Sequence, residues 1–238
     1  MTSDIFEQIV KKALFGTSVF KDETKLFREY IPNRLPRREK ELERISRDFR
    51  PILKDKSNFP VNIALSGKSG VGKTVVAKYF CEKLTNYSKS LEKKIEYQYC
   101  NCYTYRTRSA LLYHLLSKLY KATCRGFEPE TLLLDLHNRL KRDNKKLVLI
   151  LDEVHVLKDE VLFFLQLSDP NIYYILISRD YFFKQMLNVN LSGRINDHIK
   201  LDGYSKEDLI EILNFRTEEA FKQGSISSQI IELIANIA

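Results

Sequence analysis

The chain has 238 residues, of which 44% are hydrophobic and 29% are charged, enough for one well-packed domain or one large domain with part of a second. No stretch approaches the roughly 18 consecutive apolar residues of a membrane span, and Met1–Lys12 lacks the apolar core of a secretory signal, so we expect a cytoplasmic protein without a membrane partner. The four cysteines follow no zinc-ligand spacing, which favours reduced thiols. The formal charge of +8 fits a polyanionic partner and ordinary solubility equally well.

The first part of the chain is predicted to be partly irregular. A short amphipathic helix is expected over residues 4–14, followed by an irregular segment over 15–35. A charged helix is expected over 36–50, because Pro36 suits a first helical position and Pro51 ends or kinks a helix.

After this helix, apolar strands alternate with amphipathic helices. Strands are expected at 61–66, 95–101, 147–151, 172–177 and 198–201. Helices are expected from the end of a glycine-rich turn to about residue 84, and at 108–121, 130–142, 158–167, 180–188, 206–222 and 227–237. This alternation predicts a parallel sheet with helices on both faces.

A phosphate-binding motif follows the first strand. The segment Gly67-Lys-Ser-Gly-Val-Gly-Lys-Thr74 fits G-x-x-x-x-G-K-[ST] without a mismatch. Its glycines allow a tight turn whose N–H groups point at one phosphate, and the next helix adds its positive N-terminal end. Lys73 is expected against the β- and γ-phosphates, and the Thr74 hydroxyl on Mg²⁺. The alternative is a glycine-rich turn that only precedes a helix.

An acidic pair ends the third strand. Asp152 is expected to hold Mg²⁺ directly or through water, and Glu153 to orient or deprotonate the water that attacks the γ-phosphate. An acid at the second position favours an ATPase over a small-molecule kinase. The alternative is two acids that cap a strand. His155 is a candidate base, but we interpret it as a solvated or structurally bonded histidine, and the other histidines receive no role.

Further segments resemble one family. They are Pro32-Asn-Arg-Leu-Pro-Arg-Arg-Glu39, Asn101-Cys-Tyr-Thr-Tyr-Arg-Thr-Arg108, Arg125-Gly126, Leu151-Asp-Glu-Val154, Ile177-Ser-Arg-Asp180 and Gly203-Tyr-Ser-Lys-Glu-Asp-Leu-Ile-Glu-Ile-Leu-Asn-Phe-Arg216. From about Tyr30 onward the chain therefore resembles the archaeal origin-recognition initiators of the Orc/Cdc type, which are AAA+ ATPases. The resemblance implies an α/β fold, a P-loop AAA+ core with a parallel five-stranded sheet flanked by helices, followed by a partial helical lid.

The same resemblance implies a division of the chain. Residues 1–35 would form an N-terminal extension, residues 36–202 the AAA+ nucleotide-binding core, and residues 203–238 the start of the lid. The winged-helix DNA-binding domain of the family would lie beyond this chain.

The resemblance also implies a nucleotide-binding set. The phosphates would be held by Gly67, Gly70, Val71, Gly72, Lys73, Thr74 and Val75. Arg34 and Pro36 lie in the segment that wraps the adenine in the family. Tyr204 and Arg216 would contact the nucleotide from the linker and the lid, although Arg216 also fits a solvated helix arginine.

Two arginines correspond to catalytic positions of the family. Arg194 lies where such ATPases carry an arginine that reaches the γ-phosphate of a neighbouring subunit, and an isolated exposed arginine is the alternative. Arg179 follows Ser178 where the family's first sensor is usually asparagine. An arginine there can touch a γ-phosphate, but how the attacking water is positioned stays open.

The function implied by the resemblance is an ATPase that binds ATP or ADP with Mg²⁺ and hydrolyses ATP slowly. It would recognise replication-origin double-stranded DNA, mainly through the domain beyond this chain, act with other initiator subunits and help to load the replicative helicase. The resemblance also implies that a helical element between the second and third strands can touch duplex DNA. The basic residues that flank the predicted helix could make this contact or could be solvated side chains: Arg106, Arg108, Lys118, Lys121 and Arg125. The alternatives are a loader or remodeller ATPase that acts on protein partners, or a nucleotide-locked scaffold.

Overall fold

The computed structural model describes residues 5–6, 10, 18–27, 29–54, 60–123, 126–157, 160–166, 170–181 and 192–237. It divides into a core unit, Arg37–Gly203, and a helical unit that joins Met1–Pro36 with Tyr204–Ala238. The helices expected over 4–14 and 180–188 lie almost entirely outside the described residues.

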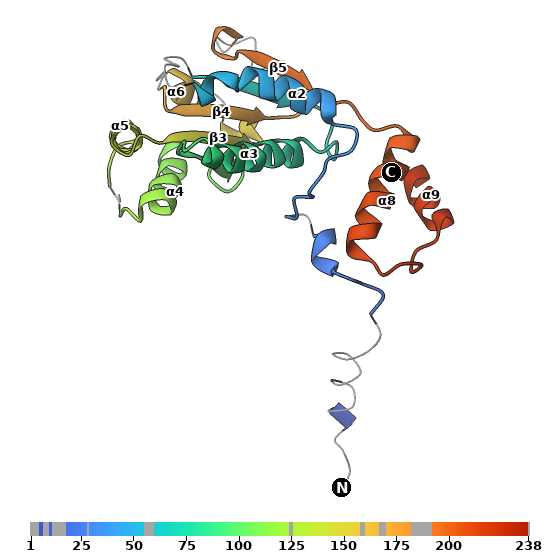
Figure 1. The fold of residues 1–238 in the computed structure, drawn as a ribbon. Coiled ribbons are helices and arrows are strands. Elements are labelled where there is room, and N and C mark those ends of the chain that lie inside the picture. The colour runs from blue at the N-terminus through green and yellow to red at the C-terminus, as the bar shows by residue number, and fades with distance from the viewer. Residues whose placement is uncertain are drawn as a thin grey trace. The chain divides into compact units, whose positions relative to one another are not determined.

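The core unit is built on a five-stranded parallel sheet in the order β2-β3-β4-β1-β5 (Figure 1). The strands are β1 (Asn62–Ser66), β2 (Ile95–Asn101), β3 (Lys146–Asp152), β4 (Ile172–Ile177) and β5 (Asp197–Lys200). The helices of this unit are α2 (Glu39–Asp48), α3 (Lys73–Ser90), α4 (Arg108–Tyr120), α5 (Pro129–Arg142) and α6 (Glu160–Gln166). This architecture confirms the predicted fold class.

The central strands are buried on both faces, as their continuous apolar sequences predict. Leu147, Leu149 and Leu151 of β3 pack in one cluster with buried leucines of α4 and α5. On the other face, the Phe49 ring that follows α2 lies 5.2 Å from Phe80 of α3, between ring centroids. Side chains alternate along a strand, so Asp152 is on the face opposite Leu151, the face that α3 covers.

The start of α2 differs from the expectation. Pro36 was expected at the first helical position, but the helix begins at Glu39 with Arg38 as its N-cap. Arg37 adopts a φ of 64°, a left-handed turn that prevents the helix from extending back to the proline. Pro51 lies at the start of a short 3-10 turn after α2, so the prediction that it ends the helix is confirmed.

The helical unit contains α8 (Lys206–Ala220) and α9 (Ser228–Ile237). Ser205 and Asp208 form a capping box at the start of α8. The N-terminal segment packs against the other end of this helix, since Lys21 N donates to Ala220 O at 2.8 Å and the rings of Phe20 and Phe221 are 4.8 Å apart. Among the described residues, no helix has both the length and the apolar character needed to cross a bilayer.

Candidate functional site

The phosphate loop connects β1 to α3 at the carboxyl edge of the sheet. Gly67, Gly70 and Gly72 have φ angles of 150°, 86° and 91°, in the region that side chains disfavour. A Cβ atom on Gly67 would lie 2.4 Å from the carbonyl oxygen of Leu201, so only glycine fits at this position. Gly72 is the N-cap of α3, which places the loop at the positive end of an 18-residue helix.

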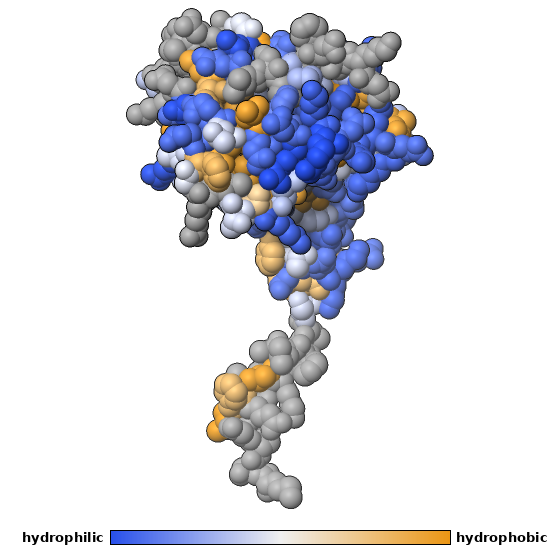
Figure 2. Space-filling view, turned by 90° about the vertical axis from the view of Figure 1, so that its left-hand side faces the viewer, coloured by the Kyte–Doolittle hydropathy of each residue, from blue (hydrophilic) through white to orange (hydrophobic). Residues whose placement is uncertain are grey.

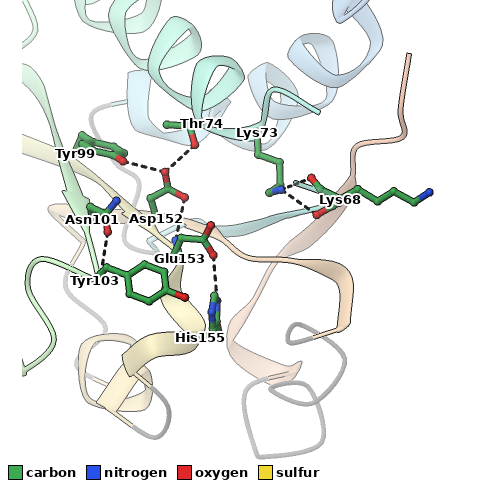
Figure 3. A network of polar contacts seen from close by, with 10 residues as sticks. Lys68, Lys73, Thr74, Tyr99, Asn101, Tyr103, Asp152, Glu153 and His155 are labelled. Atoms are coloured by element: carbon green, nitrogen blue, oxygen red, sulfur yellow. Dashed lines mark hydrogen bonds and ion pairs between the residues drawn. The ribbon is translucent and has the colours of Figure 1, made fainter. Parts of the chain in front are cut away.

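Lys73 folds back over this loop. Its Nζ donates to the carbonyl oxygens of Gly67 and Lys68, at 2.9 and 2.7 Å, whereas the Lys68 side chain extends away (Figure 3). Burial lowers the pKa of Lys73, and the nearby carboxylates of Glu153 and Asp152 oppose this shift. The loop therefore holds a cation at its centre that phosphate oxygens can attract.

Asp152 lies where β3 meets the first turn of α3. Its Oδ2 accepts hydrogen bonds from the Thr74 hydroxyl at 2.7 Å and from the Tyr99 hydroxyl at 3.0 Å (Figure 3). Its Oδ1 accepts from the Glu153 amide at 2.9 Å. Oxygen ligands from a hydroxyl and a carboxylate suit Mg²⁺, so Thr74 and Asp152 fit the ion that the sequence implies.

Glu153 follows with a φ of 54°, an unusual backbone for a residue with a side chain, which costs on the order of 1–3 kcal/mol. This turn brings Glu153 Oε2 to 3.4 Å from Nδ1 of His155 (Figure 3). The His155 ring also packs edge-on against Tyr103, and burial lowers its pKa. His155 thus contacts the glutamate that we expect to act on water.

The two expected catalytic arginines occupy different surroundings. Arg179 follows β4 and is exposed. The Nη1 of Arg194 donates to the Leu165 carbonyl oxygen of α6 at 3.0 Å, so this guanidinium is engaged within its own chain.

The remaining nucleotide candidates belong to the helical unit. The Arg216 guanidinium lies over the Tyr30 ring, 5.1 Å from its centroid, and the Tyr30 hydroxyl donates to Glu219 at 3.1 Å. Tyr204 is half-buried, Arg34 is exposed and Pro36 is buried. These four residues belong to the helical unit, whereas the phosphate loop belongs to the core unit.

Sequence reasoning missed two groups beside the loop. One is Tyr99; because side chains alternate on β2, its register with β3 could have indicated that it faces the Asp152 side. The other links Ser66, Asp180 and His198: the Ser66 hydroxyl donates to Asp180 Oδ1 at 2.6 Å, and His198 Nε2 lies 2.7 Å from the same hydroxyl oxygen. Ser66 ends β1, Asp180 follows β4 and His198 lies in β5, so these side chains come from distant segments, and nothing in their local sequences marks them.

The basic side chains around α4 differ in their availability. Arg108 forms ion pairs with Glu130 and Glu160, whereas Arg106, Lys118 and Lys121 are exposed. Figure 2 shows a largely hydrophilic surface on this side of the core unit, with small separate apolar patches. Arg125 lies outside the described residues.

Comparisons with known proteins identify the family of this chain. The family model described as "AAA domain" matches residues 61–186. The chain is 28% identical to the ORC1-type DNA replication protein 2 of Sulfurisphaera tokodaii, covering 98% of this chain and 60% of that protein. It is 29% identical to the ORC1-type DNA replication protein 1 of Methanothermobacter thermautotrophicus, covering 99% and 62%. The chain thus spans about three fifths of the length of these curated relatives.

Solved structures share the fold. The Aeropyrum pernix ORC2 protein, in ADPNP and ADP complexes, matches with a TM-score of 0.85 and 20% identity over 92% of this chain and 61% of that one. The Aeropyrum pernix ORC1 protein in complex with DNA matches with a TM-score of 0.83 and 24% identity over 93% and 60%. The chain therefore belongs to the AAA domain family and resembles the archaeal ORC1-type DNA replication proteins along nearly its whole length.

Proposed function

We propose that this chain is the nucleotide-responsive part of an archaeal replication initiator. It binds ATP with Mg²⁺, hydrolyses ATP slowly, and acts with other initiator subunits on replication-origin double-stranded DNA to help load the replicative helicase. The observation that carries this proposal is the contact between Thr74 and Asp152, which joins the phosphate loop to the tip of β3. The similarity to ORC1-type replication proteins over 98% of the chain supports the biological role.

The residues of the chain divide the work at this site. The loop amides and Lys73 bind the triphosphate, and bound phosphate replaces the carbonyl partners that Lys73 has now. Thr74 and Asp152 hold Mg²⁺, which supplies charge neutralisation on the phosphates. Glu153 accepts a hydrogen bond from the attacking water and orients it, while His155 and the turned backbone fix where that carboxylate points.

DNA contact within this chain is expected to be directed at phosphates. The exposed side chains of Arg106, Lys118 and Lys121 supply positive charge, but we assign no contact to base edges, so DNA binding should weaken steeply as salt rises. The DNA complex of the related Aeropyrum pernix ORC1 protein supports this part of the proposal.

The test compares the wild-type chain with Glu153→Gln in ATP binding by calorimetry and in single-turnover hydrolysis. The variant should bind ATP about as tightly as wild type and hydrolyse it about 10²- to 10⁴-fold more slowly, because a neutral amide can neither polarise the attacking water as a carboxylate does nor accept its proton. Equal hydrolysis by both proteins would contradict the role of Glu153. Absence of ATP binding by the wild type would reject the nucleotide function as a whole.

The DNA part is tested separately by fluorescence anisotropy with labelled duplexes at several salt concentrations. Binding that weakens with salt, and still more in Lys118→Ala/Lys121→Ala, supports contact through these side chains. Salt-insensitive binding would contradict contact through phosphates. No binding at any ionic strength would confine DNA contact to regions outside this chain.

A further inference from the structure

The chain passes between its two units twice. It enters the core unit at Arg37, directly after Pro36, and leaves it after Gly203. Arg38 is thus one residue inside the first passage, and Asp202 is one residue before Gly203. Both belong to the core unit, and Nη2 of Arg38 donates to the carbonyl oxygen of Asp202 at 2.9 Å.

The same nitrogen also contacts the phosphate loop. Nη2 of Arg38 donates to the carbonyl oxygen of Val71 at 2.9 Å, and Nη1 donates to Glu41 at 2.7 Å. Arg38 is only 4% exposed, so this guanidinium is almost fully withdrawn from water. A buried charge is costly unless its donors are hydrogen-bonded, and the Arg38 guanidinium donates to Glu41 and to the carbonyl oxygens of Val71 and Asp202.

The local backbone explains how Arg38 reaches these partners. The left-handed turn at Arg37 redirects the chain just before α2, and Arg38 becomes the N-cap of that helix. Its side chain is therefore attached to a rigid element. If the Val71 carbonyl moves, the planar guanidinium of Arg38 cannot move with it without straining its hydrogen bond to the Asp202 carbonyl.

We infer that Arg38 is a positioning residue that couples the phosphate loop to the connector leading into the helical unit. This inference rests on the proposed nucleotide binding, because a bound phosphate is what would fix the peptide groups of the loop. Fixing Val71 then fixes the guanidinium, and the guanidinium fixes the carbonyl of Asp202. Nucleotide occupancy is in this way transmitted to the place where the chain leaves the core.

A purely structural role would be to fasten α2 to the sheet, and Arg44 already does this. Its Nε donates to Asp197 Oδ2 at 2.6 Å, and its Nη2 donates to the carbonyl oxygen of His198 at 3.1 Å. Arg44 belongs to the same helix and contacts β5 rather than the loop or Asp202. Arg44→Gln is therefore the matched control for Arg38→Gln.

The experiment is hydrogen–deuterium exchange of the whole chain with and without saturating MgADP. In the wild type and in Arg44→Gln, ADP should slow exchange both in the loop peptide (residues 67–75) and in the connector peptide (residues 200–206). In Arg38→Gln the loop should still respond, while the response of the connector falls about tenfold, the size expected for losing a hydrogen bond to a charged group. Arg38→Lys keeps the positive charge but lacks the planar guanidinium that can donate to several acceptors at once. Its connector response should therefore lie between those of Arg38→Gln and the wild type.

Each outcome of this experiment either supports or overturns the coupling through Arg38. A connector response that persists in Arg38→Gln, or is lost equally in Arg44→Gln, overturns the coupling. If circular dichroism shows that Arg38→Gln is unfolded, Arg38→Lys carries the decision. Unfolding of both variants beside a folded Arg44→Gln assigns Arg38 a structural role and also overturns the inference. If the wild-type loop itself does not respond, nucleotide binding has failed, which is a different result from lost coupling.

Discussion

Two pairs of acidic residues in the core unit show how surroundings decide what a carboxyl group does. Asp152 and Glu153 are neighbours in sequence, but the left-handed backbone at Glu153 gives the two carboxylates different partners. Asp48 and Asp197 come from α2 and β5, far apart in sequence, and their carboxyl groups hydrogen-bond each other. The carboxylates of the first pair contact different partners, whereas those of the second pair share a proton, held mainly by Asp48, only below about pH 6.

The second pair has one dominant cation. Arg44 donates to Asp197 and, with the bond from Asp48, holds the pKa of Asp197 low although burial opposes this. Burial, and then Asp197, raise the pKa of Asp48 to about 6. The two pairs therefore differ in what their surroundings favour. At the end of β3 the carboxylates face groups that suit a bound cation, whereas between α2 and β5 the negative charge is offset within the chain by Arg44 and by protonation of Asp48.

The largest effect is expected at Lys73, the cation beside Asp152 and Glu153, and it concerns the affinity for ATP. Lys73→Ala should weaken ATP binding about 10- to 100-fold, because a charge-assisted hydrogen bond to phosphate is lost. Isothermal calorimetry measures this. Lys68→Ala is the control, because the Lys68 side chain points away from the loop centre. The affinity of this variant for ATP should stay near that of the wild type. Equal losses in the two variants would mean that general charge, not the loop cation, binds the nucleotide.

The second prediction concerns the shared proton. The folded chain binds the Asp48 proton more tightly than the unfolded chain, so stability is lost as pH rises from the usual value near 3.8 through about 6. Asp48→Asn stays neutral and can donate to Asp197 at any pH. It should be more stable than wild type at pH 8, by about 1 kcal/mol, and indistinguishable from it only below the usual pKa of 3.8.

Urea denaturation at pH 8 and at a pH below 3.8 measures this difference. Asp143→Asn is the control, because a hydrogen bond from Arg142 lowers the pKa of Asp143, and its replacement should bring no gain as pH rises. A constant stability difference between Asp48→Asn and wild type at both pH values would disprove the shared proton.

The smallest effect is expected at Tyr99. Tyr99→Phe removes one of the hydrogen bonds to Asp152 Oδ2, so the gain in nucleotide affinity that Mg²⁺ provides should fall about two- to fivefold. Calorimetry with and without Mg²⁺ gives this gain. Tyr97→Phe, on the same face of β2 but two residues earlier, should leave it unchanged. A loss in Tyr97→Phe as large as in Tyr99→Phe would point to packing of the strand instead.

The strands and the phosphate loop could be predicted because their signals are local. β2 and β4 occupy the predicted residues, since apolar runs between turn signals mark buried strands. The motif from Gly67 to Thr74 specifies its own turn and the start of its helix. The end of α3 was less predictable: the helix continues to Ser90, beyond the expected end near residue 84, because nothing in that stretch breaks it.

The missed features all depend on contacts between distant segments. Arg38 looks like any arginine in a charged helix, and only the fold brings the carbonyls of Val71 and Asp202 to it. The left-handed backbone of Glu153 is imposed by the junction after β3, because glutamate itself does not favour it. The roles of Arg179 and Arg194 stay predictions, since a neighbouring subunit or a bound nucleotide would define them.

The first glycine of the phosphate motif carries a constraint that has nothing to do with phosphate. The Leu201 carbonyl, directly after β5, occupies the space beside Gly67, so the end of this strand and the phosphate loop pack closely against each other. Even alanine at residue 67 would push the last strand outward before any ligand arrived. Selection for tight packing at that seam would thus preserve the glycine in a descendant that had given up nucleotides altogether.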